Sequence, residues 1–316
     1  MNKRNENLED FEEQSKVNEL NLTSVTEYFT EKGYRCLELE QQWRHVTGSL
    51  ERDGEKFFLK LASTSLISER TRNEAKWNKL INSLPPSQQP PIKVPNVYEE
   101  GLYNGLFWIL SDYIDGRPLV LPEQSNKARL LEENLPIIAK TSVGILRIKT
   151  DKKLPNDIKG INGGRSKEGY LSHIQNWLTK VESDTSDVYQ FIEDRINSFQ
   201  TAPAHGDFVP WHILIDSERK LYVIDGEHSG ITRVKFYDLA HFYHRVYTKL
   251  KRVDIADEYI KQFIKIWKFN EKDRECARMV IAHRLIGGYF DAQTDKITSI
   301  ELQDELKARL LENKVI

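Results

Sequence analysis

The pattern of apolar and polar positions divides the chain into two parts that contain different elements. Up to about residue 113, short apolar runs that partly alternate with polar residues predict strands at 35–42, 45–50, 56–61, 97–101 and 106–113. Asp53-Gly54 and Asn104-Gly105 predict tight hairpin turns. A helix is expected at 23–31, and a longer one at 65–84 that ends at Pro85-Pro86. This part is therefore expected to form a five-stranded antiparallel sheet with one long helix.

Beyond Asp115-Gly116-Arg117-Pro118 the pattern becomes mainly helical. Helical spacing covers about 123–148, 169–183, 185–199 and most of 236–313, and strands are predicted only at 211–215 and 221–224. We therefore expect an N-terminal lobe at 21–116 and a C-terminal lobe at 117–316. A Lys- and Gly-rich loop at 151–167 is expected to be mobile and to cover a substrate. Residues 1–20, with six acids against three bases, are expected to be a disordered leader.

Composition narrows the class of protein. The chain has 316 residues, 46 basic and 48 acidic side chains and a formal net charge of -2. This balance gives no support for a nucleic-acid or membrane-surface partner. Its two cysteines, Cys36 and Cys276, have no Cys-x-x-Cys spacing, which argues against a zinc ribbon or a disulfide framework. No apolar run approaches the length of a membrane span, and we expect a cytoplasmic protein.

Two carboxylates mark the predicted strands of the second part. Asp207 precedes the strand at 211–215, and Asp225 follows its mate at 221–224, so both are expected near one edge of a hairpin. Phosphoryl transfer to a hydroxyl needs an acid to orient the hydroxyl and oxygen ligands to hold magnesium. It also uses a strand lysine paired with a helix glutamate. Lys60 on the third strand and Glu74 on the next helix have that order.

Several segments together resemble the aminoglycoside phosphotransferase and choline kinase family, whose members are related to protein kinases. The first is His205-Gly206-Asp207-Phe208-Val209-Pro210-Trp211-His212, which is similar to the catalytic segment His-Gly-Asp-x-x-x-x-Asn. Ile224-Asp225-Gly226-Glu227 is similar to the metal segment, and Asp238-Leu239-Ala240 to the Asp-Leu-Ala that follows it. Residues 109–116 resemble the hinge between lobes. The resemblance covers about residues 30–290 in the family's order.

The resemblance implies an α+β, two-lobed protein-kinase-like fold with a small antiparallel-sheet N-lobe and a larger, mainly helical C-lobe. It also implies a kinase that transfers the γ-phosphoryl group of ATP or GTP to a hydroxyl of a small molecule. Asp207 would be the catalytic base and Asp225 the Mg²⁺ ligand. Lys60 and Glu74 would act on the nucleotide phosphates.

The resemblance implies further contacts and also shows two departures. Ser111 and Tyr113 would offer backbone hydrogen bonds to adenine. His212 stands at the metal position where the family has asparagine, and magnesium prefers oxygen ligands to imidazole nitrogen. The phosphate-covering loop at 43–49 has a single glycine, Gly48.

These departures keep two other classes open. A nucleotide-binding pseudokinase would act as a regulatory or interaction module, and a helical binding protein would use no nucleotide at all.

Asp238, His241 and His244 share a helical spacing that could gather a metal ion, although core packing is the simpler interpretation. His205 is expected to hydrogen-bond to loop backbone. The acceptor and the oligomeric state are left open by the sequence.

Overall fold

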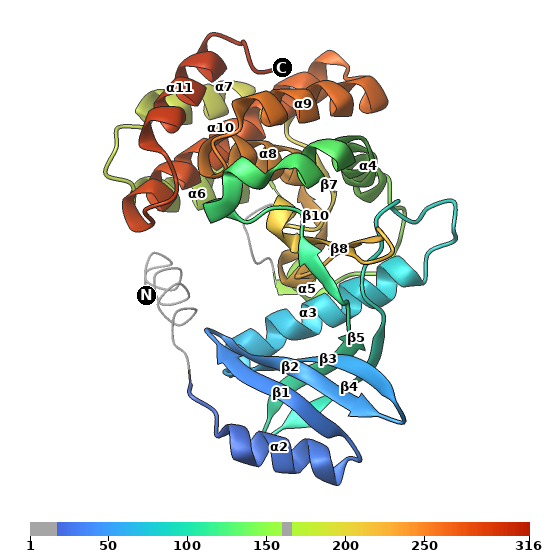
Figure 1. The fold of residues 1–316 in the computed structure, drawn as a ribbon. Helices are drawn as coiled ribbons and strands as arrows, with labels where there is room; N and C mark the ends of the chain where they lie inside the picture. Colours follow the sequence, from blue (N-terminus) through green and yellow to red (C-terminus); the bar gives the residue numbers. More distant parts are fainter. Residues whose placement is uncertain (1–17, 160–165) are drawn as a thin grey trace. The chain divides into compact units, whose positions relative to one another are not determined.

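The computed structural model describes residues 18–159 and 166–316, and the chain divides into two compact units (Figure 1). Unit 1 comprises the described residues up to Ser83, together with Val94–Asp115 and Asp225–His228. Unit 2 comprises Leu84–Lys93, Gly116–Ile224 and Ser229–Ile316. Most of the expected leader and the centre of the expected lid, 160–165, lie outside the described residues.

Unit 1 is built on one antiparallel sheet whose strand order is β1-β2-β3-β5-β4. The strands are β1 (Arg35–Gln42), β2 (His45–Arg52), β3 (Glu55–Ala62), β4 (Val97–Tyr103) and β5 (Leu106–Asp112). Its helices are α2 (Leu22–Glu31) and α3 (Ser65–Asn82). All seven elements occur where the pattern of apolar and polar residues predicts them. Each strand has one apolar face to bury, and each helix has one apolar stripe.

The two faces of this sheet pack against different helices. Trp108 and Leu110 of β5 lie in a core cluster with Val25 and Phe29 of α2. The intervening Phe107 and Ile109 lie instead in a cluster with Ala75 of α3. Side chains alternate along a strand, so α2 and α3 cover opposite faces. In β3 the same alternation sends Leu59 and Leu61 to the α2 side and leaves Lys60 on the α3 side.

Turn and cap residues explain where the elements of unit 1 end. At the β2–β3 turn Asp53 and Gly54 have φ values of 54° and 82°, and Asn104 and Gly105 repeat this at the β4–β5 turn with 49° and 81°. Such left-handed pairs are typical of two-residue hairpins. Helix α2 begins after Asn21 and α3 after Thr64, and each of these side chains accepts a hydrogen bond from a backbone N–H of the first turn.

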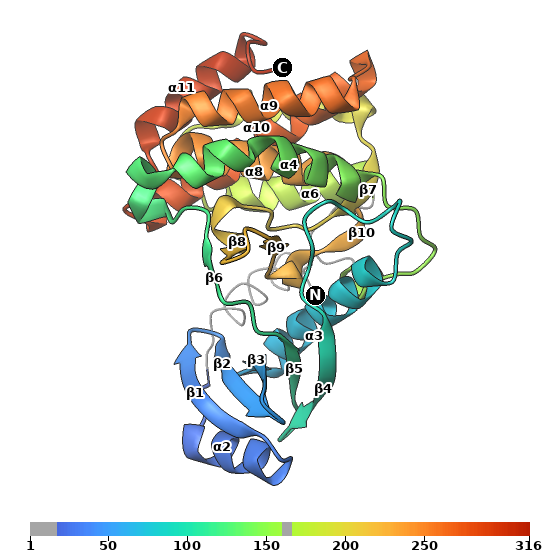
Figure 2. The ribbon, with the colours of Figure 1, turned by 45° about the vertical axis from the view of Figure 1, so that its right-hand side comes forward.

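Unit 2 is mainly helical, with two small sheets (Figure 2). Its α-helices are α4 (Arg129–Leu146), α5 (Pro155–Lys159), α6 (Lys167–Leu178), α7 (Ser186–Arg195), α8 (Tyr237–His244), α9 (Val253–Trp267), α10 (Glu271–Thr294) and α11 (Ile300–Leu311). The strands are β6 (Gly116–Pro118), β7 (Thr201–Ala204), β8 (Ile213–Asp216), β9 (Leu221–Val223) and β10 (Gly230–Val234). Short 3-10 helices of unit 2 cover Pro122–Lys127, Ile196–Ser198 and Pro210–His212, and a π-helical turn covers Arg245–Lys249. A further 3-10 helix at Gly226–His228 belongs to unit 1.

The expectation that this part has strands only near 211–225 is wrong. Strand β7 precedes that hairpin in the sequence and β10 follows it, and these two strands pair with each other. Strand β6 pairs with β8. These strands are three to five residues long, and β6 and β7 each contain a proline. Such short segments carry no readable alternation, so their pairing depends on tertiary contacts.

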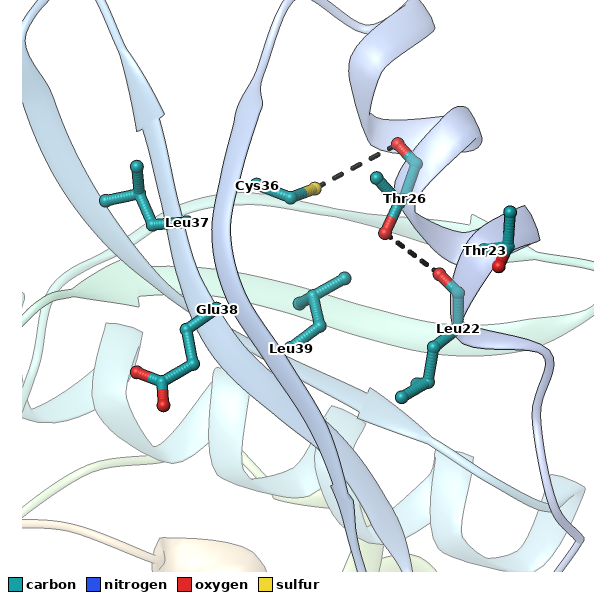
Figure 3. A pocket seen from close by; sticks show the side chains of 7 residues that line it. All are labelled: Leu22, Thr23, Thr26, Cys36, Leu37, Glu38 and Leu39. Carbon is teal, nitrogen blue, oxygen red and sulfur yellow. Dashed lines mark hydrogen bonds between the residues drawn. The ribbon is translucent and has the colours of Figure 1, made fainter.

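One pocket lies in unit 1 between α2 and β1 (Figure 3). Its lining includes Leu22 and Thr26 of the helix and Cys36 and Leu39 of the strand, and the Cys36 thiol lies 3.9 Å from the Thr26 carbonyl oxygen. No residue predicted for the functional site lines it. Across 18–159 and 166–316, no helix has both the length and the apolar character needed to cross a bilayer.

Candidate functional site

The predicted pair of Lys60 and Glu74 forms within unit 1. Lys60 lies on the face of β3 that α3 covers, and Glu74 lies on the buried side of α3. Lys60 Nζ donates a hydrogen bond of 2.6 Å to Glu74 Oε2, and the two residues are 8% and 6% exposed. A buried lysine with a carboxylate partner is held in one position, so its ammonium group can be directed at a ligand.

Asp225 meets the same lysine. Its Oδ1 accepts a second hydrogen bond of 2.6 Å from Lys60 Nζ, and Glu227 Oε2 lies 3.8 Å from that nitrogen. Asp225 has φ of 65°, a left-handed conformation that side chains rarely adopt outside turns. Three carboxylates therefore surround a single ammonium group.

This arrangement shifts the pKa values of its members in a consistent direction. Burial disfavours the charged form of Lys60, but Asp225, Glu74 and Glu227 outweigh burial and raise the pKa of the ammonium group. Burial raises the pKa of Glu74, and the charge of Lys60 offsets this only in part because Asp225 and Glu227 repel the carboxylate. Lys60 is therefore cationic at neutral pH, while the carboxylates compete for it.

Glu227 lies near several basic side chains, and these contacts were not predicted from the sequence. It is 2% exposed, and its Oε1 lies 3.1 Å from Arg44, 3.2 Å from His228 and 3.6 Å from Arg70. Burial alone would raise the pKa of Glu227, but its hydrogen bond to His228 and the charge of Lys60 hold it well below the usual range. Its place two residues after Asp225 was the available signal. Its arginine partners are distant in sequence.

The segment at 43–49, expected as a phosphate-covering loop, is a tight turn followed by β2. Trp43 has φ of 48°, and the Arg44 guanidinium lies 4.0 Å from the centre of the Trp43 ring. A Cβ on Gly48 would lie 1.9 Å from the Glu38 carbonyl oxygen, so this glycine permits close approach of β1 and β2. Burial, and then the charge of Lys60, lowers the pKa of His45 to about 3.

The two residues expected to bind adenine differ in position. Ser111 lies inside β5, paired with Phe58 on one side and with Val97 on the other. Tyr113 follows the end of β5 and is 40% exposed, and Lys56 Nζ lies 5.5 Å from the centre of its ring. Of the two, Tyr113 is the residue outside the sheet's strand pairing.

In unit 2 Asp207 lies on a loop whose backbone is held by hydrogen bonds. Asp238, at the start of α8, accepts hydrogen bonds from the backbone N–H groups of His205 (2.7 Å) and Gly206 (2.9 Å). Gly206 has φ of 84°, which a residue with a side chain would adopt only at a cost. The backbone N–H of Asp207 lies 3.4 Å from His205 Nδ1, which confirms that His205 contacts loop backbone.

Two histidines contact Asp207. His241 Nε2 lies 2.9 Å from Asp207 Oδ1, and His212 Nδ1 lies 3.1 Å from the Asp207 backbone oxygen and 3.5 Å from Oδ2. Burial, followed by the charge of Arg284, lowers the pKa of His241 to about 3, so its ring is neutral. A neutral ring in hydrogen-bond contact with an ionised carboxylate donates from Nε2. The Asp207 side chain keeps 28% exposure and can accept another hydrogen bond.

Asp238, His241 and His244 share a helical spacing, but their side chains have different partners. Asp238 binds backbone N–H groups, His241 contacts Asp207, and His244 Nε2 lies 2.9 Å from Gln303 Oε1. Each side chain therefore has its own partner, as the core-packing interpretation requires. Sequence reasoning missed the contact of His241 with Asp207, although His241 lies only three residues after the Asp-Leu-Ala motif.

Each unit thus assembles its own part of the predicted chemistry. Unit 1 brings Lys60, Glu74 and Asp225 together, and unit 2 brings His212 and His241 to Asp207. The first set offers a fixed cation and carboxylate oxygens, which suit phosphates and a hard metal ion. The second set offers an oriented carboxylate that can accept a proton.

Comparison with known proteins shows the family and the fold. The profile of the phosphotransferase enzyme family (APH) matches residues 38–278. No curated protein sequence matches the chain. A thermostable mutant of aminoglycoside phosphotransferase APH(4)-Ia, in ternary complex with ADP and hygromycin B, superposes with a TM-score of 0.65 at 14% identity, covering 92% of this chain and 98% of that one.

Two further solved structures are similar. Choline kinase LicA from Streptococcus pneumoniae has a TM-score of 0.54 at 13% identity and covers 92% of this chain and 98% of its own. A microcompartment-associated aminopropanol kinase has a TM-score of 0.55 at 12% identity, with 94% and 99% covered. These likenesses confirm the expected fold class, an antiparallel-sheet part and a mainly helical part as in protein kinases. The chain belongs to the phosphotransferase enzyme family.

Proposed function

We propose that the protein is a kinase that transfers the γ-phosphoryl group of ATP to a hydroxyl of a small molecule. The observation that carries the proposal is the fixed ammonium group of Lys60, held at 2.6 Å by both Glu74 and Asp225. Burying such charged groups costs desolvation free energy, and buried charges with shifted pKa values cluster at functional sites. GTP is a second candidate donor. Both cysteines are free thiols, in keeping with a cytoplasmic protein.

Asp207 is the proposed base. Its carboxylate accepts the proton of the acceptor hydroxyl while that oxygen forms a bond to the γ-phosphorus and the bond from the γ-phosphorus to the bridging oxygen breaks, releasing ADP. His241 Nε2 contacts Oδ1 at 2.9 Å, which orients the carboxylate for the acceptor hydroxyl. The loop cannot shift easily, since Asp238 binds its backbone.

The nucleotide is assigned to residues of unit 1. Lys60 would bind phosphate oxygens while Glu74 keeps its ammonium group in place, and the exposed edge at Tyr113 would contact adenine. Ser111 is a weaker candidate because its backbone lies between two strands.

The donor set fits magnesium in part. The Asp225 carboxylate is an oxygen ligand with 29% side-chain exposure, as a hard cation requires, and bound Mg²⁺ would neutralise charge on the phosphates. His212 fits less well, because its Nδ1 is directed at the Asp207 backbone oxygen and imidazole is a poor magnesium ligand. We therefore assign magnesium to Asp225 first and His212 to a supporting role.

Replacing the base tests the proposal. Asp207→Asn should lower phosphoryl transfer by roughly 100 to 10,000-fold and leave the dissociation constant of ATP nearly unchanged, because Asp207 acts on the acceptor. Transfer is measured as ADP release against a panel of small alcohols. Asp254→Asn, an exposed acid of unit 2, serves as the matched control and should change neither quantity. Equal transfer by Asp207→Asn and wild type would remove Asp207 from the mechanism.

A nucleotide-binding pseudokinase is the second candidate, favoured by the histidine at position 212. It predicts that ATP binds and stabilises the protein while no acceptor or water accelerates ADP release. Magnesium-dependent ADP release above the level of Asp207→Asn would contradict it.

A further inference from the structure

Arg284 is a buried cation of unit 2 without a carboxylate partner in the described part of the chain. It lies on α10 and is 9% exposed. Its Nε has no hydrogen-bond partner among the described residues. The polar contact that its guanidinium makes there is one long hydrogen bond, 3.4 Å from Nη1 to the Tyr237 hydroxyl. A guanidinium has five N–H donors, so most of its hydrogen-bonding capacity is unused.

Other arginines on or beside α10 do have acids. Arg278 lies 2.8 Å from Glu275, Arg274 lies 3.8 Å from Glu271, and Arg245 lies 2.5 Å from Asp291. Arg284 is more buried than these neighbours, yet it has no carboxylate within 4 Å among the described residues.

No carboxylate of residues 18–159 and 166–316 forms an ion pair with this charge. The guanidinium carbon lies 5.9 Å from the centre of the Tyr237 ring, near the outer limit of a cation–π contact. Burial and the charge of Arg284 keep nearby histidines neutral, with the pKa of His241 lowered to about 3. A buried charge without a partner is strongly destabilising, so such a group normally meets an anion.

Other polar atoms near Arg284 also lack partners. Tyr170 Oη, His241 Nδ1 and His283 Nδ1 are fully buried and have no hydrogen bond within the described residues. The His283 ring lies 5.2 Å from the Tyr170 ring and 6.4 Å from the Tyr237 ring, so these groups form one cluster with Arg284. Several unsatisfied polar groups in one place indicate a missing hydrogen-bonding ligand, to which Tyr170 Oη can donate and from which His241 Nδ1 can accept.

This cluster continues to the proposed base. The Tyr237 ring stacks on the His241 ring with 5.7 Å between centres, and His241 contacts Asp207. A small ligand whose anionic end lies at Arg284 would therefore have its other end near the Asp207 carboxylate. Tyr237 is only half-buried, so the cluster reaches the surface of the unit.

We propose that the phosphoryl acceptor carries a carboxylate beside its hydroxyl, and that Arg284 binds this carboxylate. The inference rests on the proposed function and names the substrate class of the same site. Arginine matches a carboxylate with two parallel hydrogen bonds, which gives both affinity and orientation. An acceptor amine at the same place would be repelled. The hydroxyl group would then lie toward Asp207, as transfer requires.

Matched pairs of small ligands test the substrate class without any turnover. Glycerate is compared with glycerol, and serine with ethanolamine, by calorimetric titration and by melting temperature in the absence of nucleotide. We expect binding of at least one hydroxy acid and a raised melting temperature, with no such effect of its partner lacking the carboxylate.

Three variants connect this binding to Arg284. Arg284→Met should weaken hydroxy-acid binding roughly 10 to 100-fold, as expected for a charge-assisted pair, while leaving ATP binding unchanged. Its melting temperature without ligand should be equal to or above that of wild type, since the lost charge has no partner to leave behind. Arg284→Lys keeps the charge and should bind more weakly than wild type but better than Arg284→Met. Arg274→Gln on the same helix is the control and should change nothing.

The outcomes separate this inference from the proposed kinase activity. Equal response to both members of each ligand pair, or a lower melting temperature of Arg284→Met with unchanged ligand binding, would show that Arg284 is structural and overturn the inference. Turnover of amino alcohols by wild type and Arg284→Met alike would retain the kinase and also reject the carboxylate. Carboxylate binding that depends on Arg284, without ADP release for any acceptor, would support the site and reject the kinase.

Discussion

At the scale of single residues, the unusual feature is that one lysine ammonium group lies among three carboxylates. Lys60 Nζ contacts Glu74 and Asp225 at 2.6 Å and has Glu227 3.8 Å away. Such a group is stable only as a set, because removing the cation leaves several buried carboxylates to repel one another. Arg44 and Arg70 near Glu227 compensate part of that charge.

Lys60→Met should therefore be costly, and its effect should depend on Glu74. We expect a loss of about 3–5 kcal/mol in the free energy of unfolding for Lys60→Met alone, because buried carboxylates then lack their partner. In the Glu74→Gln background the loss should be smaller, with a coupling of about 1 kcal/mol or more. Urea unfolding of wild type, the two single variants and the double variant measures this coupling. ATP titration of the same four proteins should show the same non-additivity.

Lys76→Met, an exposed lysine on α3, is the matched control for that cycle and should change stability by less than about 0.5 kcal/mol. Additive effects of Lys60→Met and Glu74→Gln would mean that the two side chains do not act on one another in solution.

The histidine at position 212 leads to a prediction about metal preference. Asparagine would offer an amide oxygen in place of imidazole, so His212→Asn should raise magnesium-dependent transfer, and manganese should support wild type relatively better than magnesium. Rates are compared across metal concentrations, because a changed maximum rate and a changed metal affinity are different effects.

His212 also contacts the Asp207 backbone oxygen at 3.1 Å, which gives the opposite outcome a clear meaning. Lower activity of His212→Asn with both metals would show that the histidine positions the Asp207 loop.

At the scale of elements, α8 is the support on which the Asp207 loop rests. Its first turn carries Asp238, which is 2% exposed and accepts the backbone N–H groups of His205 and Gly206. One turn later the same helix presents His241 to Asp207. A single helix therefore fixes both the backbone of the loop and the orientation of its carboxylate.

The titration of Asp238 gives this support a pH dependence. Burial raises the pKa of Asp238 from 3.8 to about 6, and the two N–H donors offset this only in part. The folded protein thus binds the proton more tightly than the unfolded chain, so the stabilisation is complete below about pH 4 and is lost as pH rises through about 6. Asp238→Asn cannot titrate. The free energy of unfolding of wild type minus that of the variant should fall by about 2 kcal/mol from pH 4 to 6.5.

Unfolding in urea at several pH values measures that difference. Asp254→Asn, which changes an exposed acid, should not reproduce the trend. A difference between wild type and Asp238→Asn that stays constant with pH would mean that Asp238 keeps its ordinary pKa in the folded protein.

At the scale of the whole molecule, each unit has its own core and its own set of proposed functional residues. Unit 1 buries Phe29, Leu59 and Trp108 around its sheet, and unit 2 buries aromatic residues such as Phe242 and Tyr259 between α8 and α9. The proposed nucleotide residues belong to unit 1 and the proposed base to unit 2. Substitutions in unit 1 should therefore abolish the binding of one ligand, the nucleotide. Substitutions in unit 2 should abolish the binding of the other ligand, the acceptor.

Nucleotide should raise the melting temperature of the whole protein. A ligand that binds only the folded state stabilises it by about 2.7 kcal/mol at a concentration 100 times its dissociation constant. ATP with magnesium should have this effect on wild type and on Asp207→Asn, but much less on Lys60→Met, and GTP is tested alongside. No shift with either nucleotide would favour a binding protein of another class.

The sequence by itself predicted the elements of unit 1 and the residues proposed for the chemistry. Alternating residues and the Asp-Gly and Asn-Gly turns predicted the sheet of unit 1, and the order of strand and helix predicted the pair of Lys60 and Glu74. These features depend on neighbours a few positions apart, which is why they can be read locally.

The tertiary structure decided which distant residues meet. Strands β7 and β10 pair although neither has a readable pattern, Glu227 collects Arg44 and Arg70 from far along the chain, and His241 reaches Asp207 from another helix. Arg284 is the clearest case, since a charged residue on a helix gives no sign of whether an acid will face it. Contacts of this kind depend on how separate elements pack, and packing is a property of the folded chain as a whole.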